Sequence, residues 1–158
     1  MLVLDEQLLG RNLDAALGRW YRGPVRFITD LRPGTLIKDD AIPVLLRQQQ
    51  HATFLTIDEA DFWRKVVIDA HFCVVCFALP DSRAREIPEL LRAVFRLPAF
   101  RTKARRMGKV LRIAQRTVSY YTYRERQIRV VPLRGRSQPE PRGPATRSSG
   151  RGTQPPRR

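Results

Sequence analysis

The sequence predicts an α/β domain with a mainly parallel β-sheet. Short apolar segments that suit buried strands alternate with segments whose apolar residues recur at helical spacing. This alternation is typical of layered proteins in which helices cover a parallel sheet. A chain of 158 residues corresponds to about one ordinary domain, and it has enough Leu, Val, Ile and Phe to build a core. We therefore expect one folded unit with an appendage.

The N-terminal third predicts strand, helix and strand in that order. The apolar residues 2–4 form the first strand, and residues 25–28 form the second after a break at Gly23 and Pro24. The helix between them carries apolar residues at helical spacing. These are Leu8, Leu9, Leu13, Ala16, Leu17 and Trp20. A loop over residues 31–38 then precedes a helix that Asp39 or Asp40 can cap.

The middle of the chain supplies two further buried strands and a helix. Residues 52–56 and residues 72–79 are continuous apolar runs of strand length. Cys73 and Cys76 lie three apart in the second run, so they should face opposite sides of the sheet as core thiols rather than share a disulfide or a metal. An amphipathic helix over residues 87–95 follows, and Pro98 stops it.

The C-terminal third is basic. A helix over residues 101–106, a strand over residues 109–113 and a hairpin from residues 117–123 and 127–133 are expected. This gives a main domain over residues 1–114, a hairpin extension over 115–133 and a tail over 134–158. The tail is rich in Arg, Pro, Gly and Ser, and we expect it to be disordered because it cannot offset its ordering entropy.

Charge is unevenly distributed along the chain. The net charge is −1 over residues 1–95, +10 over residues 96–133 and +6 over residues 134–158. A basic part joined to one with clustered acids suits a polyanion that one half holds and the other half processes. The excess of Arg over Lys, 26 to 4, also fits a bias in genome composition without any selection for binding.

Targeting features are absent from the sequence as it stands. Residues 1–4 are too short for the apolar part of a secretory signal. The longest wholly apolar run, residues 72–79, is far shorter than the roughly 18 residues of a membrane span. A cytoplasmic protein without a membrane partner is the resulting expectation.

Two apolar runs end abruptly in carboxylates. Asp5 and Glu6 follow the first strand, and Asp58, Glu59 and Asp61 follow residues 52–56. Parallel sheets gather ligands outside the carboxyl ends of their strands, so these acids would meet if the two strands are neighbours. Mg²⁺ and Mn²⁺ prefer such oxygen ligands and leave coordination positions for phosphate. A bound ion of this kind supports phosphodiester hydrolysis without a side-chain nucleophile.

The same segments resemble a known family, the PIN-domain ribonucleases. The likeness is closest to the short PIN-like branch that opens with a strand ending Asp-Glu-Asn, which residues 2–7 (LVLDEQ) match with Gln7 for Asn. The family's acidic helix start corresponds to residues 39–42 (DDAI). Its Thr-x-Asp-x-Asp-Phe motif corresponds to residues 56–62 (TIDEADF), with one residue more between the aspartates. The resemblance covers about residues 1–78.

The resemblance implies a metal-dependent endoribonuclease, often the toxin of a toxin–antitoxin pair. It implies that Asp5, Asp58 and Asp61 are the catalytic ligands of Mg²⁺ or Mn²⁺, with Asp39 and Asp40 as further metal ligands and Glu6 and Glu59 as supporting acids. Either Asp61 or Glu59 fills the second position of the longer motif. RNA is the expected partner, and an antitoxin protein and a second copy of the chain are the other candidate partners. The RNA backbone would be held by basic residues, namely Arg101, Lys103, Arg105, Arg106 and Arg112.

Other interpretations remain open at the level of sequence. Asp5 with Glu6, Asp39 with Asp40, and the acids of residues 58–61 could each simply begin a helix. The basic half could bind RNA or a ribosome without catalysis. A phosphoacceptor signalling domain would also place acids at strand ends. His51 and His71 are expected in loops or at strand edges, and the tyrosines of residues 120–123 could stack bases or pack a hairpin.

Overall fold

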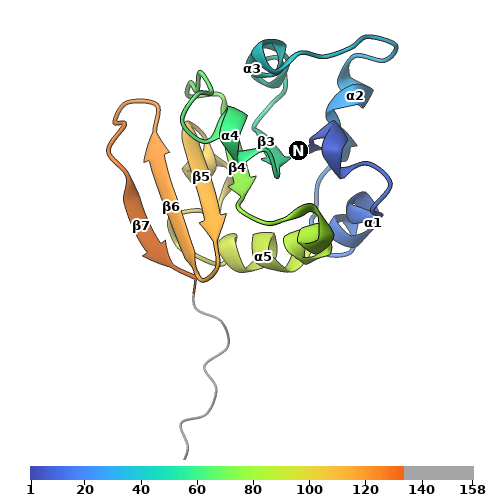
Figure 1. The fold of residues 1–158 in the computed structure, drawn as a ribbon. Helices are drawn as coiled ribbons and strands as arrows, with labels where there is room; N and C mark the ends of the chain where they lie inside the picture. Colours follow the sequence, from blue (N-terminus) through green and yellow to red (C-terminus); the bar gives the residue numbers. More distant parts are fainter. Residues whose placement is uncertain (134–158) are drawn as a thin grey trace, which may run out of the picture.

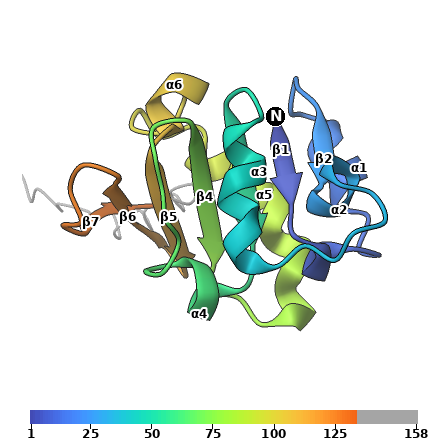
Figure 2. The same ribbon diagram turned by 90° about the horizontal axis from the view of Figure 1, so that it is seen from above.

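The computed structural model of the protein describes residues 1–133, and the predicted tail over residues 134–158 lies outside the described residues. Seven strands form one sheet in the order β2-β1-β3-β4-β5-β6-β7 (Figure 1 and Figure 2). The strands are β1 (Leu2–Leu4), β2 (Val25–Phe27), β3 (Ala52–Thr56), β4 (Phe72–Phe77), β5 (Lys109–Ala114), β6 (Thr117–Thr122) and β7 (Arg129–Pro132).

Short helices connect these strands. The α-helices are α1 (Leu13–Gly18), α2 (Ile28–Leu31), α3 (Ile42–Arg47), α4 (Glu59–Phe62), α5 (Ile87–Val94) and α6 (Lys103–Arg106). Three 3-10 turns accompany them, η1 (Glu6–Leu8), η2 (Asp39–Ala41) and η3 (Asp81–Glu86). Within residues 1–133, every helix is too short or too polar to cross a bilayer.

The sheet is mainly parallel, which confirms the predicted α/β class. Strands β2, β1, β3, β4 and β5 run in one direction, whereas β6 and β7 are antiparallel to their neighbours. The predicted hairpin is present, and it extends the parallel sheet as β6 and β7. In Figure 2 the parallel strands begin near the N-terminus and end near α4. We call these two ends of the strands the amino edge and the carboxyl edge.

Helices cover both faces of the sheet because its strands are apolar on both sides. Leu4, Leu55 and Val75 point into a core that also contains residues of α1 and α5. Val3 and Phe54, on the opposite face, join residues of α3 and α4 in a second core. The two thiols follow the same alternation, since Cys73 belongs to the first core and Cys76 to the second. Both thiols are free, as the strand geometry predicts.

The first predicted helix is shorter than its apolar pattern suggests. Leu8 lies in η1, and the regular helix begins only at Leu13. Between them, Gly10 and Asn12 adopt left-handed backbone conformations with φ of 75° and 54°, which a continuing helix cannot accommodate. The helix predicted over residues 87–95 forms as α5, and its apolar side packs on the first core.

We expect Leu91→Ala to lower the free energy of unfolding by about 2–5 kcal/mol, because it leaves a cavity between α5 and the sheet. Leu91 is fully buried, whereas Leu36 is 81% exposed. Leu36→Ala is therefore the matched control, and it should change stability by less than about 0.5 kcal/mol. Urea denaturation of both variants measures the difference. Equal losses would show that α5 is not seated on this core.

Candidate functional site

Strands β1 and β3 bring the two carboxylate motifs together at the carboxyl edge. They pair in parallel with Leu4 opposite Leu55, so Asp5 and Thr56 are neighbours directly after that pair. The Thr56 hydroxyl donates a hydrogen bond of 2.5 Å to Asp5 Oδ2 and accepts one of 2.9 Å from the Asp58 amide. Asp5 is only 5% exposed. Thr56 therefore links the first aspartate to the second motif.

Asp58 has two further contacts. Its Oδ1 accepts a hydrogen bond of 3.1 Å from the Asp61 amide, so Asp58 caps α4 as the structural interpretation of these acids predicts. Its Oδ2 accepts a bond of 3.3 Å from the Gln7 side chain. Gln7 thus joins the two motifs from the side of β1. In the family that residues 2–7 resemble, Asn stands at this position.

Asp39 and Asp40 lie at the start of the next segment, in η2. Neither carboxylate caps a helix, because Lys38 and Ala41 occupy the cap positions and no side-chain cap bond is present there. Helix capping therefore does not explain these two acids. Together with Asp61 they line a groove of about 390 Å³ between α3 and α4. The apolar walls of this groove include Phe62 and Val66.

The acids are close enough to affect one another's ionisation. Partial burial, followed by the charges of Asp61, Asp58, Glu6 and Asp40, raises the pKa of Asp39. Burial also raises the pKa of Asp5, although the hydrogen bond from Thr56 opposes this shift. The charge of Glu6 contributes a smaller increase to the pKa of Asp5. Negative charge thus accumulates at the carboxyl edge.

Two cations balance part of this charge. Lys65 Nζ lies 3.0 Å from Asp61 Oδ1 on the exposed side of α4. Arg112 Nε lies 2.5 Å from Glu59 Oε1, and both side chains are about two-thirds buried. Glu59 is therefore committed to an ion pair. Among residues 1–133, Asp5, Asp39 and Asp58 have no salt-bridge partner.

Residues 1–133 contain no preassembled group of three or more His, Cys, Asp or Glu side chains at metal-binding geometry. The chemistry of the gathered side chains nevertheless fits a hard cation, because all are oxygen donors and several lack a positive partner. Asp5 is linked through Thr56 to the Asp58 amide, and Asp61 follows Asp58 in the same turn. Asp39 is close enough to Asp58 and Asp61 for their charges to raise its pKa. Of the gathered side chains, these four carboxylates are the candidate ligands.

The basic helix α6 lies away from the carboxylates. Gly108, just after α6, donates its amide to Phe72 O at the first residue of β4, which places α6 at the amino edge (Figure 2). Six-residue strands separate the two edges by about 20 Å. The exposed side chains of Arg101, Lys103 and Arg105 therefore cannot contact a phosphate at the carboxylates. Of the basic residues assigned to RNA, Arg112 alone lies beside the acids.

Arg106 does not form part of a binding surface. Its side chain is 2% exposed, and its guanidinium carbon lies 3.8 Å from the centre of the Phe95 ring. Its Nη1 donates to the carbonyls of Phe100 and Arg101. The prediction that Arg106 holds RNA is therefore wrong, because the guanidinium serves packing inside the protein.

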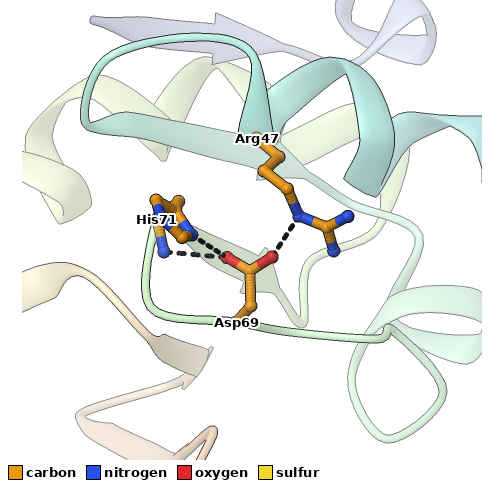
Figure 3. Close-up of polar contacts among 3 residues, drawn as sticks. All are labelled: Arg47, Asp69 and His71. Atoms are coloured by element: carbon orange, nitrogen blue, oxygen red, sulfur yellow. Dashed lines mark hydrogen bonds and ion pairs between the residues drawn. The ribbon is translucent and has the colours of Figure 1, made fainter.

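A second polar cluster joins Arg47, Asp69 and His71 near the start of β4 (Figure 3). One carboxylate oxygen of Asp69 accepts a hydrogen bond from Arg47 Nε. The other accepts a hydrogen bond of 2.8 Å from the His71 amide. His71 Nδ1 lies 3.1 Å from the same oxygen. His71 lies in a turn before β4, as predicted, and Asp69, two residues earlier, is its partner. The cluster ties the end of α3 to the segment before β4.

Comparisons of the chain with protein-family models, with curated proteins and with solved structures found no match.

Asp39→Asn should raise the melting temperature of the metal-free protein at pH 7. The expected rise is only about 1–2 °C, because solvent screens the charge of this exposed residue. A raised pKa means that ionised Asp39 destabilises the folded state above that pKa. The gain should vanish below about pH 3.8, the ordinary value, where Asp39 is protonated whether folded or unfolded. Calorimetry across this pH range tests the shift. Asp14→Asn changes the net charge equally and should not reproduce the gain.

Asp69→Asn should act in the opposite direction and lower the melting temperature at pH 7 by about 2 °C. Desolvation alone would raise the pKa of Asp69, but hydrogen bonds from His71 and Arg47 together lower it. A lowered pKa stabilises the fold above the ordinary value of 3.8, and this stability is lost as the pH falls through the folded pKa. The gap between variant and wild type should therefore narrow in acid. A gap independent of pH would contradict the assigned contacts.

Proposed function

We propose that the chain is a PIN-like endoribonuclease that hydrolyses RNA phosphodiester bonds with Mg²⁺ or Mn²⁺. The observation that carries this proposal is the linkage of Asp5 and Asp58 through Thr56, with Asp39 and Asp61 beside them. These four residues come from three separate segments of the chain. Their convergence at the carboxyl edge of a parallel sheet is the arrangement expected of a ligand site.

The protein residues have distinct roles in this proposal. A bound ion would make a water more acidic and neutralise charge on the phosphate. Asp5 and Asp58 are the principal ligands because their hydrogen bonds fix their positions, and Asp39 and Asp61 complete the set. Thr56 and Gln7 are positioning residues, since each donates to one of these carboxylates. Glu59 is paired with Arg112 and is therefore not counted among the ligands.

The proposed substrate is cytoplasmic RNA, and the resemblance to toxin-type nucleases suggests an antitoxin protein as a partner. A rival function is RNA binding without catalysis. The exposed cations of α6 favour this rival, because they lie at the opposite edge of the sheet and need no help from the carboxylates. The two functions differ in their dependence on a divalent ion.

Purified protein should cleave RNA with Mn²⁺ or Mg²⁺, and EDTA should abolish this activity. Asp58→Asn should reduce cleavage by about 100-fold or more, because it removes a principal ligand. Asp14→Asn, an exposed acid of α1, should cleave as well as the wild type. Gel analysis of a labelled RNA measures the rates. Undiminished cleavage by Asp58→Asn, or cleavage that resists EDTA, would sink the proposal.

Ion binding can be measured without activity. Mn²⁺ should raise the melting temperature of the wild type, since a ligand that binds only the folded state stabilises it. The same ion should raise that of Asp5→Asn much less, while Asp14→Asn should respond like the wild type. RNA binding that survives in Asp5→Asn without any cleavage by the wild type would favour the non-catalytic rival.

A further inference from the structure

Two arginines from distant segments converge on one buried tyrosine. The guanidinium carbons of Arg64, after α4, and Arg126, between β6 and β7, lie 5.6 and 5.3 Å from the centre of the Tyr121 ring. Arg126 Nη1 also donates a hydrogen bond of 3.2 Å to the Arg64 carbonyl. The Tyr121 hydroxyl in turn donates to the Trp63 carbonyl at 2.7 Å. The chain therefore holds both arginines against the same support.

These two cations lack a counter-charge. Both side chains are exposed, and within residues 1–133 neither has a carboxylate at salt-bridge distance. Three basic neighbours are paired, namely Lys65, Arg112 and Arg129. Like charges fixed close together repel one another, and an arriving anion relieves that repulsion. Guanidinium groups match phosphate in geometry and are weakly hydrated, so they suit this role.

A shallow hollow adjoins the arginine pair. It has a volume of about 440 Å³ and is lined by Glu59, Ala60, Trp63, Arg64 and Lys65. Trp63 is half-buried and lines the hollow, and its ring packs on Tyr121 with ring centres 5.3 Å apart. An aromatic ring held beside unpaired arginines offers a base a stacking surface and its phosphates a cation.

The hollow also includes one acid of the second carboxylate motif. Glu59 lines one part of it and directly follows Asp58, while Arg64 lines another part. Arg112 is paired with Glu59 and so places a further cation beside the hollow. The hollow and the arginine pair therefore form one surface, made by Glu59, Trp63, Arg64, Arg112 and Arg126. We call it the α4 surface.

We propose that the α4 surface binds single-stranded RNA, with Arg64 and Arg126 on the phosphates and a base on Trp63. A single strand is required because stacking on Trp63 needs an unpaired base. The identity of the polyanion rests on the proposed function. The surface includes Arg126 of the β6–β7 turn, which lies outside the segment that resembles the nuclease family. The resemblance therefore does not account for this RNA contact.

Binding of a fluorescein-labelled 12-nucleotide single-stranded RNA, measured by anisotropy in EDTA, tests the surface in the full chain. The double variant Arg64→Gln with Arg126→Gln should bind about tenfold more weakly, and the slope of log affinity against log salt should fall by about 1.4. Arg92→Gln with Arg96→Gln is the matched control. It removes the same charge from exposed positions at α5, on the opposite face, and should bind within about twofold of the wild type.

Trp63 provides a second readout. In a Trp20→Phe background, Trp63 is the one remaining tryptophan, and single-stranded RNA should quench its fluorescence more than a duplex of equal length. Arg64→Lys with Arg126→Lys should keep most of the salt slope, because it keeps the charges. Two results would overturn the proposal. One is an equal loss of affinity in the Arg64/Arg126 glutamine variant and in the Arg92/Arg96 control, and the other is Trp63 fluorescence that RNA does not change.

The two proposals fail separately. Because EDTA keeps the RNA intact, binding does not depend on hydrolysis. If the wild type cleaves RNA but the arginine variants bind it normally, the α4 surface is wrong and the nuclease stands. If no cleavage occurs but binding is lost in those variants alone, the surface stands without the nuclease. Binding of a polyglutamate peptide with the same dependence on Arg64 and Arg126 would assign the surface to an acidic protein instead.

Discussion

The parallel pairing of β1 with β3 is the constraint on which the candidate site depends. With Leu4 opposite Leu55, the backbone delivers Asp5 to Thr56, and Thr56 in turn fixes the start of the Asp58 turn. Both strands are fully buried, so a slip of one residue would reverse every side chain between the two cores. The apolar residues of these strands therefore determine where the polar site forms.

The same topology separates two kinds of charge. The acids accumulate where the parallel strands end, and α6 carries its exposed cations where they begin. Arginine has more than one role in this arrangement. Arg106 packs inside the protein, Arg112 neutralises one acid, and Arg64 and Arg126 share a tyrosine at the surface. Net charge alone would not distinguish these roles.

Most of the sheet could be predicted because its strands are short, continuous apolar runs. Residues 52–56 are an example, since five buried residues are enough for a strand but too few for an ordinary helix. The position of the acids at strand ends followed from the same runs. The apolar pattern alone did not predict the interruption at Gly10 and Asn12, although Gly and Asn adopt left-handed backbone conformations most readily. The burial of Arg106 was equally hidden, since its sequence neighbours are exposed cations.

The contacts of the site depend on long-range packing, which residue spacing does not reveal. Gln7 and Asp58 are 51 positions apart, and their hydrogen bond exists only because β1 and β3 are neighbours. The pairing of Glu59 with Arg112 likewise needs β5 beside β4. By contrast, Asp69 and His71 are only two residues apart, so their contact could have been predicted from the sequence.

The two cysteines give the protein a pair of built-in chemical reporters. Cys73 is buried in the core between the sheet and α5, and Cys76 is buried in the core between the sheet and helices α3 and α4. Burial raises the pKa of Cys73 to about 12 and also raises that of Cys76, so neither thiol reacts readily while its layer is closed. The alkylation rate of each thiol therefore follows the transient opening of one side of the sheet. Comparing the alkylation rates of Cys73 and Cys76 would therefore show whether the cores on the two faces of the sheet open together or one after the other.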